Sequence, residues 1–351
     1  QEIVIYRKLQ EIQNKKFTEE QLQTTFEKIY QFSNLADTEQ TIKEIENLEP
    51  ILMPVEDLEE FKVMRTLTHS FEYVASPGRS LKYYVVDKPT QKYLGVITMA
   101  SDVSRLPPRD NFLGWSKDNM FKDKKLNSSA IAQTIVPIQP FGYNMLGGKL
   151  IALMVGDEKI RTDWKSRYGD TLSGITTTSL YGSYSMYNSL PIWKKVGKTK
   201  GTIIIKPDNE YYFDWTNWLK KYHTKQFNLA TKSVEGKNPP TAIKQKIIKM
   251  IFSKLKIQSG KYQNEQSKGV YYIPIHENTK EFLRNEIKED KLVVSHKLHK
   301  EKYIDWWKQK AIKRYLQLHK NNQLKQTPLW YEDLDKKKVQ GWLYSRGIRY
   351  I

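Results

Sequence analysis

The stretch that decides the fold begins Ile131-Ala-Gln-Thr-Ile-Val-Pro-Ile-Gln-Pro140 and Phe141-Gly-Tyr-Asn-Met-Leu-Gly-Gly-Lys-Leu150, and after a helical run it ends Leu172-Ser-Gly-Ile-Thr-Thr-Thr-Ser-Leu180. An apolar strand leads through a glycine-bearing turn into a helix, and a Thr-rich strand follows. Because the first turn of a helix has unpaired backbone N–H groups, this turn suits a phosphate-bearing ligand. The order of elements predicts a mixed α/β sheet with a crossover helix.

The composition is that of a folded protein. With 351 residues, 39% of them hydrophobic and 12% aromatic, the chain can bury a sizeable core in one large domain with an appendage, or in two domains. It has no cysteine, which excludes a disulfide framework, a thiolate zinc site and a cysteine nucleophile. We find no apolar run of about 18 residues, so we expect a cytoplasmic protein without a membrane partner.

Charge is unevenly distributed along the chain. Residues 1–60 carry 6 basic and 14 acidic residues, whereas residues 201–351 carry 31 basic and 15 acidic ones. The basic half also contains Trp and Tyr residues. Lysine and arginine attract phosphate and aromatic rings stack on bases, so this half predicts contact with DNA. The alternative is a lysine-rich surface that only faces water.

Three regions are expected. Residues 1–67 form an acidic helical segment, residues 68–206 an α/β domain, and residues 207–351 a basic, mainly helical, nucleic-acid-binding region. In the last region Tyr271–Ile275 predicts an edge strand, because Pro274 cannot donate a ladder hydrogen bond.

Inside the α/β domain the alternation of apolar residues predicts further elements. Leu81–Val86 and Tyr93–Met99 indicate an antiparallel hairpin. A helix is expected over residues 146–168, with Gly156 as the point where it can break. Thr202–Lys206 is expected to close the sheet.

Several short segments together resemble a known fold. They are His69 before the hairpin, Leu94-Gly-Val96, Arg109-Asp-Asn-Phe-Leu-Gly-Trp115, the glycine turn at 142–148, and Tyr187 ahead of Trp193-Lys-Lys-Val-Gly197. Over roughly residues 60–206 this arrangement resembles the acyl-CoA-dependent N-acyltransferase (GNAT) fold. It is most similar to the branch that contains the phage DNA-modification protein Mom and the Druantia DruA-like family.

The resemblance implies a cofactor and a reaction. It implies acetyl-CoA or another acyl-CoA as cofactor, an exocyclic nucleobase amine in DNA as acceptor, and a bacterial or phage-encoded protein. His69 would act as the base and Tyr187 as the acid. The residues implied to bind the cofactor are Gly142, Met145, Leu146, Gly147, Gly148 and Lys149. Those implied to contact substrate or phosphate are Arg109, Asp110, Trp115, Lys308 and Arg314.

Each of these residues also has a structural interpretation. His69 can cap the preceding helix, and Tyr187 can be a core tyrosine with a hydrogen-bonded hydroxyl. The pair Gly147-Gly148 can be an ordinary turn, and Arg109-Asp110 can be an internal ion pair that holds a loop in place.

Three hypotheses of function follow. The first is an N-acyltransferase that modifies a nucleobase amine. The second is a non-catalytic GNAT-like protein that binds DNA in a phage-defence, packaging or transposition assembly. It is favoured by the unusual spacing of the glycine turn and by the lack of an acidic residue at 178–180. The third, a metal-dependent nuclease built on Asp102, Asp110, Asp118 and Asp123, lacks a convincing motif. We expect no metal, since His296-x-x-His299 has no third ligand.

Overall fold

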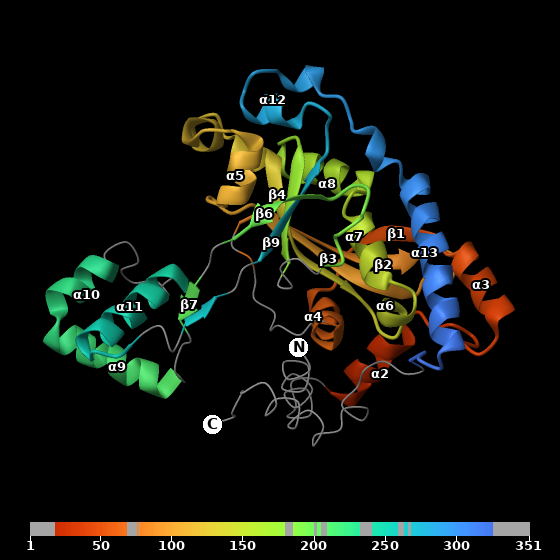
Figure 1. Cartoon of the computed structure of the whole chain (residues 1–351), viewed down its shortest axis with the longest axis horizontal. Coiled ribbons are helices and arrows are strands. Elements are labelled where there is room, and N and C mark those ends of the chain that lie inside the picture. The colour runs from red at the N-terminus through yellow and green to blue at the C-terminus, as the bar shows by residue number, and fades with distance from the viewer. Residues whose placement is uncertain are drawn as a thin grey trace. The chain divides into compact units, whose positions relative to one another are not determined.

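The computed structural model describes residues 18–68, 76, 78–179, 185–199, 202–204, 209–231, 241–258, 263–265 and 268–325. Contacts divide the chain into two compact units (Figure 1). Unit 1 is built from residues 1–178, 184–197 and 270–351, and unit 2 from residues 179–183 and 198–269. The division therefore differs from the expected boundary at residue 207, because the chain returns to unit 1 after residue 269.

A seven-stranded sheet organises unit 1, in the order β1-β2-β3-β4-β5-β9-β6. Its strands are β1 (Pro50–Pro54), β2 (Ser80–Asp87), β3 (Tyr93–Ser101), β4 (Ser129–Pro137), β5 (Gly174–Ser179), β6 (Lys194–Lys198) and β9 (Gly269–Pro274). The first four strands pair antiparallel, which confirms the hairpin, and β4 pairs parallel to β5. The mixed α/β sheet is confirmed.

The helices of unit 1 lie before, between and after these strands in the sequence. They are α2 (Glu19–Glu27), α3 (Thr38–Asn47), α4 (Leu58–Thr68), α5 (Pro107–Leu113), α6 (Phe141–Asn144), α7 (Gly147–Met154), α8 (Glu158–Tyr168), α12 (Thr279–Leu283) and α13 (Lys300–Lys320). Shorter turns are η2 (Asp118–Lys122), η3 (Lys125–Ser128), η6 (Glu289–Lys291) and η7 (His296–Leu298).

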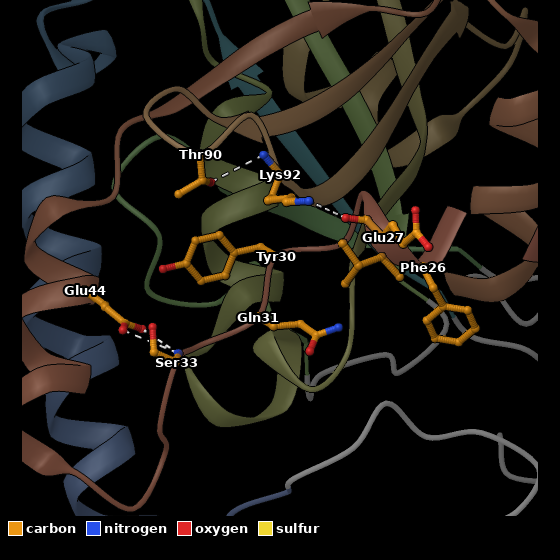
Figure 2. A pocket seen from close by; sticks show the side chains of 9 residues that line it. Phe26, Glu27, Tyr30, Gln31, Ser33, Glu44, Thr90 and Lys92 are labelled. Atoms are coloured by element: carbon orange, nitrogen blue, oxygen red, sulfur yellow. Dashed lines mark hydrogen bonds between the residues drawn. The ribbon is translucent and has the colours of Figure 1, made fainter. Parts of the chain in front are cut away.

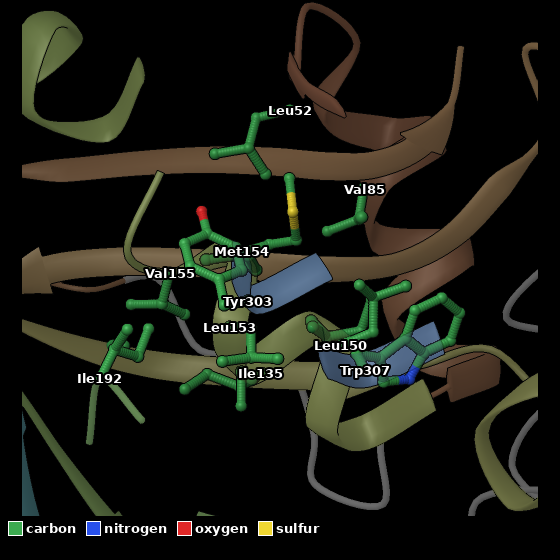
Figure 3. Close-up of a cluster of buried hydrophobic side chains, with 14 of the residues drawn as sticks. Leu52, Val85, Ile135, Leu150, Leu153, Met154, Val155, Ile192, Tyr303 and Trp307 are labelled. Carbon is green, nitrogen blue, oxygen red and sulfur yellow. The ribbon is translucent and has the colours of Figure 1, made fainter. Parts of the chain in front are cut away.

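Helices cover both faces of the sheet. In β2, Tyr83 and Val85 belong to the large core that α7 and α13 complete, whereas Tyr84 and Val86 pack in a second core with Phe61 of α4. Successive side chains of a strand point to opposite faces, so both faces of β2 are covered from Tyr83 to Asp87. Figure 3 shows the larger core, where Leu150 lies beside Trp307 of α13.

The expected helix over residues 146–168 is interrupted where Gly156 was expected to break it. α7 ends at Met154 and α8 begins at Glu158, with Asp157 as its N-cap. A side chain at Gly156 would place its Cβ 2.8 Å from Ile192 Cδ1. The break between α7 and α8 lets the chain turn at Gly156, where the side chain of Ile192 packs against the backbone.

Two strands are placed differently from expectation. β9 lies inside the sheet, between β5 and β6, and Pro274 is only its last residue. Thr202–Ile204 does not close this sheet but forms β7, which pairs antiparallel with β8 (Gln263–Glu265) in unit 2. The edge strand is instead β6, whose lysines are exposed. Lysines on an edge strand discourage pairing with another chain.

Unit 2 is a small helical unit with its own core. Its helices are α9 (Asn209–Tyr222), α10 (Thr224–Thr231) and α11 (Thr241–Lys254). The core contains Leu219 of α9 and Ile248 and Ile251 of α11, each fully buried. In the described part of the whole chain, every helix is too short or too polar to cross a bilayer.

Candidate functional site

Tyr187 lies in the large core of unit 1. Its ring packs on Trp193 and on Tyr271 of β9, with both ring-centroid distances 5.1 Å. Burial raises the pKa of Tyr187, and a hydrogen bond with Thr177 partly opposes that shift. The hydroxyl therefore stays protonated at neutral pH. The other expected catalytic residue, His69, lies outside the described residues, so the geometry of the pair stays untested.

The glycines of the 142–148 turn are needed for close packing. An added Cβ at Gly147 would lie 2.6 Å from the ring of Phe141, and one at Gly148 would lie 3.0 Å from Met186 Sδ. At Gly142 the nearest atom, in Pro137, would be 2.7 Å away. Leu146 adopts a left-handed conformation, with φ of 52°, and serves as the N-cap of α7. Close packing is therefore enough to explain why this turn contains glycines.

The remaining predicted cofactor residues make internal contacts. Lys149 Nζ donates to the carbonyl oxygens of Met186 at 3.2 Å and Asn188 at 3.0 Å. Burial lowers the pKa of Lys149, and the nearby charge of Lys310 lowers it further. Met145 is fully buried, and its carbonyl oxygen accepts from Trp307 Nε1 at 3.1 Å.

Two of the residues expected to bind acyl-CoA are held by internal contacts. A helix start binds a phosphate through outward backbone N–H groups, whereas the Lys149 ammonium is bonded to residues 186 and 188 and Met145 is inside the core. Acyl-CoA binding stays a prediction, and it requires residues 186–188 to release Lys149.

Arg109 is at the centre of a buried charge network. Its side chain is fully buried, and Nη1 lies 2.7 Å from Asp102 Oδ1. Its Nε and Nη2 donate to Asp110 Oδ1 at 2.9 and 2.6 Å, and Trp115 Nε1 donates to the same oxygen at 3.1 Å. The two carboxylates raise the pKa of Arg109 by more than burial lowers it.

The network connects α5 to the strands where β4 and β5 pair. Asp102 Oδ2 accepts from Ser129 Oγ of β4 at 2.5 Å and from Thr176 Oγ1 of β5 at 2.9 Å. The structure therefore gives Arg109, Asp110 and Trp115 an internal role, and their predicted phosphate contact stays untested. The sequence indicates Asp102 only as a carboxylate of the nuclease hypothesis, because its partners lie far along the chain.

The two predicted phosphate contacts of α13 also have partners inside unit 1. Lys308 Nζ donates to the carbonyl oxygen of Glu46 at 2.5 Å. The guanidinium of Arg314 lies 5.2 Å from the ring centroid of Tyr143. Both side chains are only half-buried. Contact with phosphate by either residue stays a prediction.

Unit 2 carries the densest positive charge. Residues 198–269 contain 15 lysines, no arginine and 5 acidic residues, a net charge of +10 out of +19 for the chain. The exposed lysines of its helices are Lys220, Lys221, Lys225, Lys246, Lys249 and Lys254. None of these six forms an ion pair with a described residue, since the ion pairs of the described residues lie in unit 1.

The structure gives no support to a metal-dependent nuclease. Asp102 and Asp110 both face Arg109, whereas Asp118 and Asp123 are exposed around η2. Among the described residues, no group of three or more His, Asp or Glu side chains could hold a metal ion.

A surface cavity of about 380 Å³ lies in the N-terminal region (Figure 2). Phe26, Tyr30, Glu44 and Lys92 are among its lining residues. Its charged groups make internal bonds: Glu44 accepts from the backbone N–H of Ser33 at 3.2 Å, and Lys92 donates to the carbonyl of Glu27. The cavity therefore shows no charge arrangement that would identify a ligand.

Comparison with known proteins gives one family. A model of the family described as Druantia protein DruA matches residues 3–285. The Druantia protein DruA of Escherichia coli (strain UMEA 4076-1) is 32% identical over 155 residues, which cover 39% of this chain and 38% of that relative. The aligned part thus spans well under half the length of this relative.

No solved structure matches the chain. The GNAT and Mom part of the resemblance therefore stays a prediction, whereas the DruA part is confirmed by a family model that spans most of the sequence. The chain belongs to the Druantia DruA family.

Proposed function

We propose that this chain is a DNA-binding protein of a phage-defence assembly, and that unit 2 holds the phosphate backbone. One observation supports the proposal above all others. A small unit with its own core carries a net charge of +10, and its exposed lysines have no acidic partner among the described residues. Such a surface attracts a polyanion, because each contact releases condensed counterions from the nucleic acid.

The proposal treats the sheet of unit 1 as a scaffold. The residues that the sequence pattern suggested for catalysis or cofactor binding make internal contacts where the structure describes them. Tyr187 packs among aromatic rings, Lys149 binds carbonyl oxygens, and Arg109 holds two carboxylates. These internal contacts are a sufficient reason for the presence of these side chains, and no catalysed reaction is needed to explain them.

The test is binding of fluorescein-labelled DNA to the full chain over a range of salt concentrations. Lys246→Gln, Lys249→Gln and Lys254→Gln together remove three charges from the exposed side of α11. If all three contact phosphate, the slope of log K against log salt falls by up to about 2.7, at about 0.9 for each contact. Affinity at low salt falls as well.

A charge-matched control separates binding from net charge. Lys43, Lys62 and Lys88 are in unit 1, each beside a glutamate. Replacing these three by Gln changes the net charge equally and should leave the slope unchanged. An affinity that does not depend on salt, or an equal effect of both triple variants, would contradict the proposal.

A second candidate function is N-acyl transfer to a nucleobase amine, favoured by the connection between β4 and β5. These strands pair in parallel at only three positions, Ser129–Ile131 with Gly174–Thr176, while β4 continues to Pro137. A glycine-started helix, α7, follows β4. Tyr187 also keeps its proton, as a general acid must.

Calorimetry with acetyl-CoA and intact-mass analysis of nucleosides test the second candidate. Bound acetyl-CoA and a new nucleoside adduct in DNA from a host that expresses the chain would favour it. In that case Tyr187→Phe should abolish the adduct and leave DNA affinity unchanged. If acetyl-CoA does not bind and no adduct forms, the second candidate is rejected and only the scaffold proposal remains.

A further inference from the structure

Two aromatic rings of unit 2 are strongly exposed. Phe213 is 66% exposed and Tyr222 is 61% exposed, although both belong to α9, whose core-facing Leu219 is fully buried. Leaving a phenylalanine in water forgoes about 1.5–3 kcal/mol of burial free energy. Exposed single apolar residues are common, so their surroundings must decide whether these two rings have a function.

One lysine lies beside the ring of Tyr222, and another shares the helix side of Phe213. Residues seven apart lie on the same side of a helix, so Phe213 shares its side with Lys220. Lys221 Nζ lies 5.1 Å from the ring centroid of Tyr222. Lys225 comes three residues after Tyr222, in the first turn of α10. Asp214 is the one acidic side chain described in this unit, and it does not form an ion pair with these lysines.

The ring of Tyr222 is held by its neighbours. Its centroid lies 6.2 Å from that of Trp218, and His223 packs against the same tryptophan at 5.3 Å. An aromatic ring that is supported on one side and open on the other loses little conformational freedom when a second flat group stacks on it.

Stacking distinguishes single strands from a duplex. In a duplex the faces of each base are covered by the neighbouring base pairs, so an exposed ring gains little there. In a single strand the base faces are free, and a ring next to lysines can take a base while the ammonium groups hold the phosphates.

We propose that unit 2 binds single-stranded nucleic acid, with one unpaired base stacked on Phe213, another stacked on Tyr222, and phosphates held by Lys220, Lys221 and Lys225. Because nine residues separate the two rings, they lie on opposite sides of α9 and take separate bases. This inference rests on the proposed function and narrows its substrate class. The stacking chemistry is common to single-stranded DNA and RNA.

The experiment measures fluorescence anisotropy with the full chain and three labelled probes: a 20-nucleotide oligo-dT, a 20-nucleotide oligo-U and a 20-base-pair duplex. Phe213→Ala and Tyr222→Ala should each weaken binding of the single strands by about 5- to 150-fold, the range of one stacked base. Duplex binding should change by less than about twofold. Phe213→Trp should keep single-strand affinity, because it keeps a stacking face.

Leu229 provides the matched control. It is 75% exposed in the same unit but is aliphatic, so Leu229→Ala removes exposed apolar surface without removing a ring. This variant should bind all three probes like the wild type. A loss equal to that of Phe213→Ala would overturn the stacking proposal, as would equal weakening of single strand and duplex by Phe213→Ala. The stacking proposal would also be overturned if a protein partner bound at Phe213 and Phe213→Ala left the affinity for nucleic acid unchanged.

Failure of this inference differs from failure of the proposed function. If the wild type binds none of the probes, both are overturned. If the lysine variants of α11 lower affinity and the salt slope while Phe213→Ala and Tyr222→Ala have no effect, only the stacking proposal is overturned. A stronger effect on oligo-U than on oligo-dT would support stacking and assign the strand to RNA, and the reverse would assign it to DNA.

Discussion

Replacing Arg109 by leucine should strongly destabilise unit 1. The substitution leaves the carboxylate of Asp102, whose side chain is fully buried, and that of Asp110, which is 20% exposed, without their cation. Removing one partner from a buried ion pair costs about 3–5 kcal/mol, because the remaining charge has lost both water and its counter-ion. That is a large part of the roughly 5–15 kcal/mol by which a folded protein is stable.

Urea unfolding followed by tryptophan fluorescence measures this loss. With a slope of about 3 kcal/mol per molar urea, the midpoint should fall by about 1–1.7 M. Glu39→Gln is the control, because it breaks the exposed pair with Lys43, which should contribute under about 0.5 kcal/mol. A triple variant, Asp102→Asn, Arg109→Met and Asp110→Asn, should regain most of the lost stability, since it leaves no unpaired charge.

A loss below about 1 kcal/mol for Arg109→Leu would refute the interpretation of Arg109 as a buried counter-ion. Unchanged stability together with weaker DNA binding would instead favour the phosphate contact expected from the sequence.

Three further predictions concern other buried groups. Burial, with the nearby charge of Arg161, lowers the pKa of His276 from 6.5 to about 4. Between these pH values only the unfolded chain takes up a proton, so the free energy of unfolding falls as pH drops from 6.5 to 4. His276→Gln should remove up to about 3 kcal/mol of this pH dependence, measured by denaturation curves at a series of pH values. Gly174→Ala would place a Cβ 1.6 Å from Tyr272 Oη, so thermal unfolding should show a loss of about 1–3 kcal/mol or more, and a near-neutral result would contradict the close approach of β9. Tyr187→Phe should lower stability by about 1 kcal/mol and leave DNA affinity unchanged if Tyr187 is only a core residue; a changed affinity would count against that role.

Local sequence patterns could predict much of unit 1. The alternation in residues 81–99 is enough for a hairpin, and Gly156 is enough to suggest the break between α7 and α8. The short segments that include Arg109–Trp115 together suggested the DruA family, which the family model confirms. Charge counts could also locate the basic half, because net charge depends only on composition.

Long-range contacts decided the rest. Nothing local shows that the chain leaves unit 1 near residue 198 and returns with β9 between β5 and β6, since strand order depends on pairing across large sequence distances. The same holds for the Asp102 network, which joins Arg109 to Ser129 and Thr176 only after β4 and β5 have paired. The sequence by itself determined the mixed α/β class, the family and the positive charge. Only the tertiary structure decided which side chains are committed to internal contacts and which, like the lysines and exposed rings of unit 2, remain available to a ligand.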